Sequence, residues 1–251
     1  MTLIVLCLCF MVTIGTGDIL PQLSSEITKL GFHREIHRKL TFPVALLPGL
    51  VPGGDVECHV MFDELIPAGA YMDPYQLENL RMFVGLNVEI HDQVDLEAPE
   101  FQSSAIHVSV FSNLSLIGDS WQAGYVFPVH IRYHGISDSS EFVRVKFITP
   151  SVAIRCQDTT YQMTFYGYGG PIHSQQSRLC SRGSPILCDW MFIQTEKVAN
   201  DISVDVPVGK MADTFLVLVV TMVTTLGACA ALVAKAVDCG KYTMFTMKKV
   251  S

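Results

Sequence analysis

The sequence predicts an all-β fold, an antiparallel β-sandwich, followed by a single C-terminal transmembrane helix. Three observations support this prediction. Short runs of alternating apolar and polar residues recur along most of the chain, Gly and Pro residues separate them, and a stretch of 20 uncharged residues lies near the C-terminus. Alternation with a period of two is typical of half-buried strands, and about 20 apolar residues make a helix that can cross a bilayer.

The N-terminus carries a short apolar run, Leu3–Ile14, which is followed by the small residues Gly15, Thr16 and Gly17. As a helix this run would span only about 18 Å, which is too short for a hydrocarbon core of about 30 Å. We therefore expect residues 1–17 to be a cleaved signal peptide. No Lys or Arg precedes the run, whereas a signal peptide usually begins with a positively charged region. The alternative is therefore a buried N-terminal strand.

The segment between the signal and the membrane span contains eight strand-like runs, and in Phe142–Ile148 the two basic residues share one face while three apolar residues share the other. The eight runs are Phe32–Phe42, Glu57–Leu65, Ile106–Phe111, Val126–Tyr133, Phe142–Ile148, Val152–Cys156, Ile186–Thr195 and Ile202–Val206. Such a number of short strands favours a sandwich. One helical segment is expected from Asp73–Pro74 to Arg81, because Asp can cap a helix and Pro suits its first position.

The uncharged stretch Phe215–Ala234 is the predicted transmembrane helix. Four Lys and one Asp follow it, a balance of 4 − 1 = +3, whereas residues 18–214 hold 13 Lys+Arg and 23 Asp+Glu, or −10. The positive-inside rule then leaves residues 235–251 in the cytosol as a tail and the sandwich domain, residues 18–214, on the lumenal or outer side.

Small residues follow two stripes of the predicted span. Thr221, Thr225 and Ala228 form one, while Gly227, Ala231 and Ala234 share another. Small side chains let helix backbones approach closely in lipid, so both stripes are candidates for helix packing. The alternative is a passive anchor.

At the C-terminus, the dilysine Lys248 and Lys249 resembles an endoplasmic reticulum (ER) retrieval signal, and the alternative is that these lysines merely flank the membrane.

The predicted lumenal domain holds four cysteines, Cys58, Cys156, Cys180 and Cys188. An even number in an oxidising compartment indicates two disulfides, although three pairings are possible and the sequence does not choose among them. The sequon Asn113-Leu114-Ser115 makes Asn113 a candidate for N-glycosylation.

Little in the sequence points to catalysis. His33 and His37, like His130 and His134, are four residues apart on strand-like segments, which places them roughly 13 Å apart and too far for one metal ion. The acidic balance, with net charge −7 and no basic cluster, argues against nucleic-acid binding. Nucleophile elbows, phosphate loops and dinucleotide motifs are absent. We therefore expect no cofactor, no metal and no catalytic residue.

Four lumenal segments follow one another in the chain: Gly31–Glu35, Ile66–Tyr75, Asp95–Pro99 and Phe127–His134. Together, in this order, they resemble the PIG-X family of phosphatidylinositol-glycan biosynthesis. The similarity extends from about Gly31 to Val208 and on into the membrane span.

The resemblance implies a type I ER membrane glycoprotein, the non-catalytic subunit of glycosylphosphatidylinositol (GPI) mannosyltransferase I. Its multispanning partner of the PIG-M type would transfer the first mannose from dolichol-phosphate-mannose to the GPI precursor. The alternative hypothesis is a membrane-anchored lumenal protein that binds or hydrolyses glycans by itself.

Overall fold

The computed structural model describes residues 20–44, 47, 50, 56–157, 172–198 and 201–247. The predicted signal peptide and the two C-terminal lysines lie outside the described residues. The chain divides into two compact units, which are described separately below. The first comprises Met1–Arg132 and Arg144–Val204, and the second comprises Tyr133–Val143 and Asp205–Ser251.

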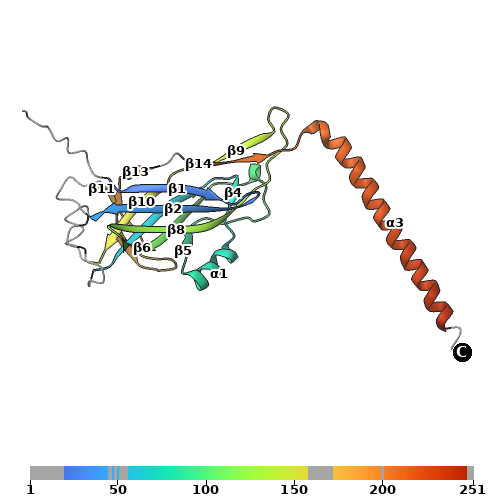
Figure 1. The fold of residues 1–251 in the computed structure, drawn as a ribbon, viewed down its shortest axis with the longest axis horizontal. Coiled ribbons are helices and arrows are strands. Elements are labelled where there is room, and N and C mark those ends of the chain that lie inside the picture. Colours follow the sequence, from blue (N-terminus) through green and yellow to red (C-terminus); the bar gives the residue numbers. More distant parts are fainter. Residues whose placement is uncertain are drawn as a thin grey trace, which may run out of the picture. The chain divides into compact units, whose positions relative to one another are not determined.

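The first unit contains two sheets (Figure 1). Sheet A has the order β13 (Glu196–Lys197), β1 (Gln22–Thr28), β2 (His33–Pro43), β8 (Ser120–Ile131) and β4 (Ala70–Tyr71), with β7 (Ser115–Ile117) also paired to β8. Sheet B has the order β11 (Ile172–Leu179), β12 (Leu187–Ile193), β10 (Ser151–Cys156), β3 (Cys58–Ile66), β6 (Ile106–Asn113) and β5 (Asn87–Ile90). Adjacent strands are antiparallel except β1 and β13, which are parallel.

The two sheets face each other across a shared core, which confirms the predicted sandwich. On β2 the alternate residues Ile36 and Leu40 are fully buried, and on β3 Phe62 is fully buried. Phe62 contacts Tyr125 of β8 with ring centroids 4.9 Å apart and the rings nearly perpendicular. The alternation in the sequence thus turns the apolar side chains of both sheets toward one interior.

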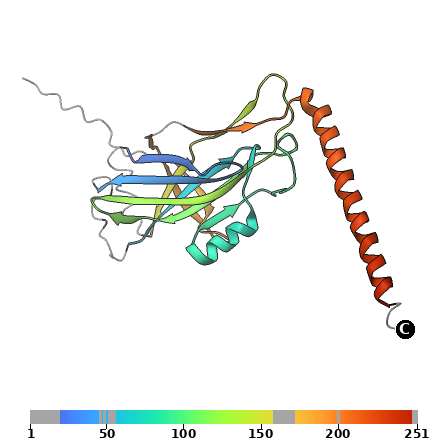
Figure 2. The same cartoon turned by 45° about the vertical axis from the view of Figure 1, so that its right-hand side comes forward.

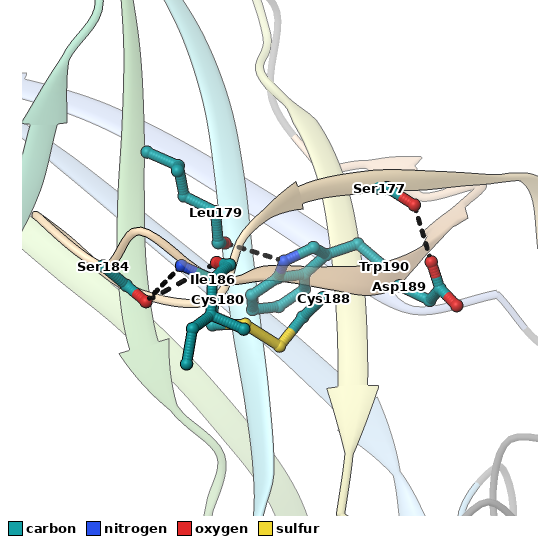
Figure 3. Close-up of a disulfide and its surroundings, with 8 residues drawn as sticks. All are labelled: Ser177, Leu179, Cys180, Ser184, Ile186, Cys188, Asp189 and Trp190. Carbon is teal, nitrogen blue, oxygen red and sulfur yellow. Dashed lines mark hydrogen bonds between the residues drawn. A yellow bond between two sulfur atoms is a disulfide. The ribbon is translucent and has the colours of Figure 1, made fainter.

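A second, smaller core lies on the other face of sheet B. The buried residues Met61, Ala153, Trp190 and Phe192 form it, and the ring of Phe111 lies 5.9 Å from that of Trp190. Figure 3 shows the β11–β12 hairpin crossing other strands of sheet B, with the side chain of Trp190 projecting from β12. The sheet therefore curls so that its last hairpin covers its own outer face.

All eight predicted runs form strands, but the prediction of about eight strands was too low. The structure adds the strands β1, β4, β5, β7, β11 and β13. Strands β1, β11 and β13 are mostly polar, as in the sequence QLSSEIT of β1, and β4, β5 and β7 have only two to four residues. None of the six therefore gives a clear periodic signal. Backbone pairing with a neighbouring strand holds them in place.

The predicted helical segment is helix α1, Pro74–Val84, and it lies beside β5 (Figure 2). The carboxylate of Asp73 accepts a hydrogen bond from the backbone N–H of Tyr75, and Pro74 occupies the first turn. The helix runs three residues beyond the predicted end because it stops at Gly85, whose φ of 71° suits a C-cap. A short 3₁₀ helix, η2 (Glu100–Gln102), precedes β6.

Strands β9 (Phe142–Phe147) and β14 (Ile202–Pro207) run through both units and form a two-stranded sheet. As the alternation predicted, Val145 and Phe147 are buried whereas Arg144 and Lys146 are exposed. In the second unit a 3₁₀ turn, η3 (Met211–Asp213), leads into the long helix α3 (Thr214–Met247).

Candidate functional site

Helix α3 has the length and composition of a membrane span. The segment Met211–Val237 has a mean hydropathy of 2.4, and none of it is buried within the protein. Apolar side chains that project from a helix without any protein neighbour need another apolar environment, and a bilayer supplies it. The helix continues to Met247, so most of the predicted cytosolic tail is helical.

All six predicted helix-packing residues lie on the open surface of α3. A Cβ atom added at Gly227 would meet nothing within 4 Å. The hydroxyl of Thr225 donates to the carbonyl of Thr221 at 2.7 Å, and that of Thr224 donates to the carbonyl of Val220 at 2.9 Å. These hydroxyls are thus satisfied within their own helix, which leaves a small, largely apolar surface for a neighbouring helix.

The four cysteines of the predicted lumenal domain form two disulfides, Cys58–Cys156 and Cys180–Cys188. Cys58 and Cys156 are directly opposite each other on the adjacent strands β3 and β10. Cys180 and Cys188 lie at the turn end of the β11–β12 hairpin (Figure 3). The backbone N–H of Cys180 also donates to the carbonyl of Ile186 at this end. Strand register therefore chooses among the three pairings that the sequence left open.

The tip of this hairpin is tied to helix α1 and to β5. Arg182 forms an ion pair with Glu78 of α1 at 2.7 Å, and the N–H of Gly183 donates to Glu89 of β5 at 3.0 Å. Hydrogen bonds from Arg81 and then Arg182 lower the pKa of Glu78 to about 2. The Trp190 indole N–H donates to the carbonyl of Leu179 at 3.0 Å, which links β12 to β11 within the hairpin (Figure 3).

A charged network is buried between the two sheets. Arg38 of β2 donates to Glu64 of β3 through Nε at 2.7 Å and Nη2 at 3.2 Å, and both side chains are almost completely buried. The hydroxyl of Tyr125 also donates to Glu64, while Arg38 reaches Ser25 Oγ and the carbonyl of Ile148. Burial and the charge of Glu64 raise the pKa of Tyr125 well above its usual value. This network links the sheets rather than offering reactive groups to solvent.

Asn113, the predicted glycosylation site, is exposed at the end of β6. Its Oδ1 lies 2.9 Å from Nδ1 of His59 on the neighbouring strand. That contact leaves the Asn113 amide nitrogen, the atom that would carry a glycan, without a hydrogen-bond partner among the described residues.

Histidines that are distant in sequence meet near the end of sheet A. The rings of His33 and His130 are 4.5 Å apart, Tyr71 stacks on His130 at 5.1 Å, and the guanidinium of Arg132 lies over Tyr71 at 4.6 Å. Burial, and then the neighbouring His33, lower the pKa of His130. Within the described residues, no group of three or more His, Cys, Asp or Glu is arranged to hold a metal ion.

Comparisons with known proteins place these features in a family. A family model described as PIG-X / PBN1 matches residues 29–237. A human protein named "GPI alpha-1,4-mannosyltransferase I, stabilizing subunit" is 28% identical over 231 residues, which cover 90% of this chain and 82% of the human one. A protein of the same name from Rattus norvegicus is 28% identical over 228 residues, which cover 90% of this chain and 84% of the rat one. No solved structure matches the chain.

Proposed function

The chain belongs to the PIG-X / PBN1 family, and from this membership we propose that it is the non-catalytic, stabilising subunit of a GPI mannosyltransferase I complex. The observation that carries the proposal is the extent of the match. It covers the sandwich and helix α3 together, and the similar curated proteins bear the name of a stabilising subunit. An accessory role needs a domain and an anchor that bind a partner, and it needs no reactive centre of its own.

The proposal includes a location and a partner. The protein would be a type I ER membrane glycoprotein, with residues 18–214 in the lumen, Phe215–Ala234 in the membrane and residues 235–251 in the cytosol. Two disulfides and an exposed sequon suit an oxidising, glycosylating compartment. The partner would be a multispanning catalytic subunit of the PIG-M type, which transfers the first mannose from dolichol-phosphate-mannose to the GPI precursor.

The chemistry of the span explains this division of labour. A polyprenyl-linked donor lies in the bilayer, so the residues that act on it are expected within or beside several membrane helices. Phe215–Ala234 offers no charged group. A single apolar helix can therefore pack against a catalytic subunit but cannot supply acid, base or metal ligands at that depth.

Deletion of this protein tests the proposed function. In cells without it, we expect the catalytic subunit to fall several-fold in steady-state amount, because an unpartnered subunit is cleared by quality control. GPI-anchored proteins at the cell surface should fall with it. Immunoblotting and flow cytometry measure the two effects, and normal levels of both would contradict the proposal. A soluble sandwich domain that restores neither, yet binds or cleaves glycans by itself, would favour the alternative of an independent lectin or hydrolase.

Enlarging the small residues of α3 tests how the span takes part. The double substitution Gly227→Leu with Ala231→Leu fills one stripe with large side chains, so we expect much less catalytic subunit to co-purify. Met222→Leu with Val233→Leu is the matched control, because at 3.6 residues per turn these positions lie about 140–160° around the helix from the centre of the Gly227 and Ala231 stripe. If both double variants retain the partner equally, α3 is a passive anchor.

A further inference from the structure

One large groove of the first unit is cationic. It has a volume of about 820 Å³ and is bordered by the β1–β2 turn, helix α1, the end of β6, the adjacent edge of β8, and Arg155 of β10. The described residues that line it include the charged side chains Lys29, Arg34, Arg155 and Glu35. Lys29 and Glu35 form an ion pair at 2.6 Å, so among the described residues neither arginine has a carboxylate partner in the groove.

Both arginines are fixed by neutral groups. The guanidinium of Arg155 lies over the ring of the buried Trp190, 5.4 Å from its centroid, and burial lowers the pKa of Arg155. Arg34 donates through Nη1 to the carbonyl of Lys29. The Nε atoms of both are buried and have no hydrogen-bond partner among the described residues. Both arginines are half-buried, and two such guanidinium groups without an anion carry a desolvation cost that an incoming anion would offset.

The rest of the lining is suited to a hydroxylated ligand. Gln76 and Asn87 contribute side-chain amides, and His59 contributes a ring nitrogen. The Oε1 of Gln76 already lies 2.9 Å from Nε2 of His130, which holds that amide in place. Amides and imidazoles form hydrogen bonds with sugar hydroxyls, whereas arginines recognise phosphate with paired N–H donors. A volume of this size lies within the range of ordinary small-ligand pockets.

We propose that this groove binds a phosphate group carried on a sugar or cyclitol, with Arg34 and Arg155 facing the phosphate and the amides facing the hydroxyls. The anion site follows from the two uncompensated arginines. The choice of a phosphorylated saccharide rests in addition on the proposed function, because a GPI precursor joins a phosphate to an inositol glycan. In this scheme the accessory subunit holds the polar end of a glycolipid near the complex as well as stabilising its partner.

The test uses the full chain, purified in a neutral detergent, with myo-inositol 1-phosphate as the probe. We expect the probe to raise the temperature of unfolding relative to sodium chloride of equal ionic strength. Isothermal titration should show binding that Arg34→Gln and Arg155→Gln each weaken about tenfold or more, as expected when a charged hydrogen bond is lost. Arg34→Lys and Arg155→Lys, which keep the charge, should retain part of the affinity.

Arg178→Gln is the matched control, because Arg178 is an exposed arginine on β11 that does not line the groove. It should bind the probe normally. No stabilisation of the wild-type chain, or affinities unchanged in both arginine-to-glutamine variants, would overturn the proposal. Because Asn113 also lines the groove, the titrations are made with and without enzymatic removal of N-glycans, and a lack of binding in both would overturn the proposal.

Two further measurements identify the source of the phosphate. Inorganic phosphate that binds as tightly as inositol phosphate would assign recognition to the phosphate alone. In phosphatidylcholine nanodiscs, added phosphatidylinositol that weakens probe binding would assign the site to a lipid headgroup.

Co-purification of the catalytic subunit is scored separately. Retained co-purification without probe binding overturns only the anion site, whereas wild-type protein that recovers no catalytic subunit overturns the proposed function.

Discussion

Replacing Glu64 with glutamine is expected to lower the free energy of unfolding of the sandwich by about 3–5 kcal/mol. The substitution keeps the size of the side chain but leaves the charge of Arg38 buried without a counter-charge. Water cannot reach that guanidinium, so the desolvation of a lone cation is uncompensated. Since domains are stabilised by only about 5–15 kcal/mol, the effect removes a large share of the total.

Urea unfolding followed by tryptophan fluorescence measures this effect on the full chain. The chain has two tryptophans, Trp121 and Trp190, both buried in the first unit, so the signal reports on the sandwich alone. Glu35→Gln is the control, since Glu35 forms a partly exposed pair with Lys29 and should cost less than about 1 kcal/mol. Equal losses for Glu64→Gln and Glu35→Gln would show that the buried pair contributes no more than a surface one.

A triple variant tests whether this buried network as a whole stabilises the sandwich. Arg38→Met, Glu64→Leu and Tyr125→Phe together remove both charges and the hydroxyl that donates to Glu64. Buried ion pairs replaced by apolar groups are often neutral or stabilising, so we expect the triple variant to recover most of the loss. A triple variant as unstable as Glu64→Gln would instead show that the network itself stabilises the sandwich.

The sequence was most informative where side chains alternate clearly. In β9 the alternation predicted which face would be buried, and in α1 Asp73 and Pro74 predicted where the helix begins. It was least informative for polar strands such as β1 and β11, whose positions depend on backbone pairing with β2 and β12. Hydrogen bonds between backbones do not depend on side-chain identity, so they leave no periodic signal.

The buried charges had a signal that the sequence analysis did not use. Arg38 lies in register with Ile36 and Leu40 on the apolar face of β2, and Glu64 lies likewise between Phe62 and Ile66 on β3. A charge on an apolar face predicts a buried partner. Which residue is that partner depends on how the two sheets stack, and no local sequence pattern encodes the stacking. The same holds for the two arginines, Arg34 and Arg155, that line one groove.

Loss of the Cys58–Cys156 disulfide is the second large effect that we expect. The bond joins residues 98 positions apart, so it closes a long loop in the unfolded chain. The chain-entropy model gives about 4.7 kcal/mol for a loop of that length and about 2.6 kcal/mol for the short loop that Cys180–Cys188 closes. Cys58→Ala with Cys156→Ala should therefore destabilise the sandwich about 2 kcal/mol more than Cys180→Ala with Cys188→Ala.

The two double variants differ in kind as well as in size. Cys58 and Cys156 lie on strands already paired through several backbone positions, so their loss acts mainly on the unfolded chain and should leave the native fluorescence unchanged. Cys180 and Cys188 close the hairpin that carries Trp190, and Cys188 packs against the Trp190 cluster, so their loss should loosen this packing and shift Trp190 emission to the red. Urea unfolding and native emission spectra of the full chain measure both effects. Equal destabilisation by the two double variants would contradict the loop-length argument, because strain or residual structure would then outweigh chain entropy.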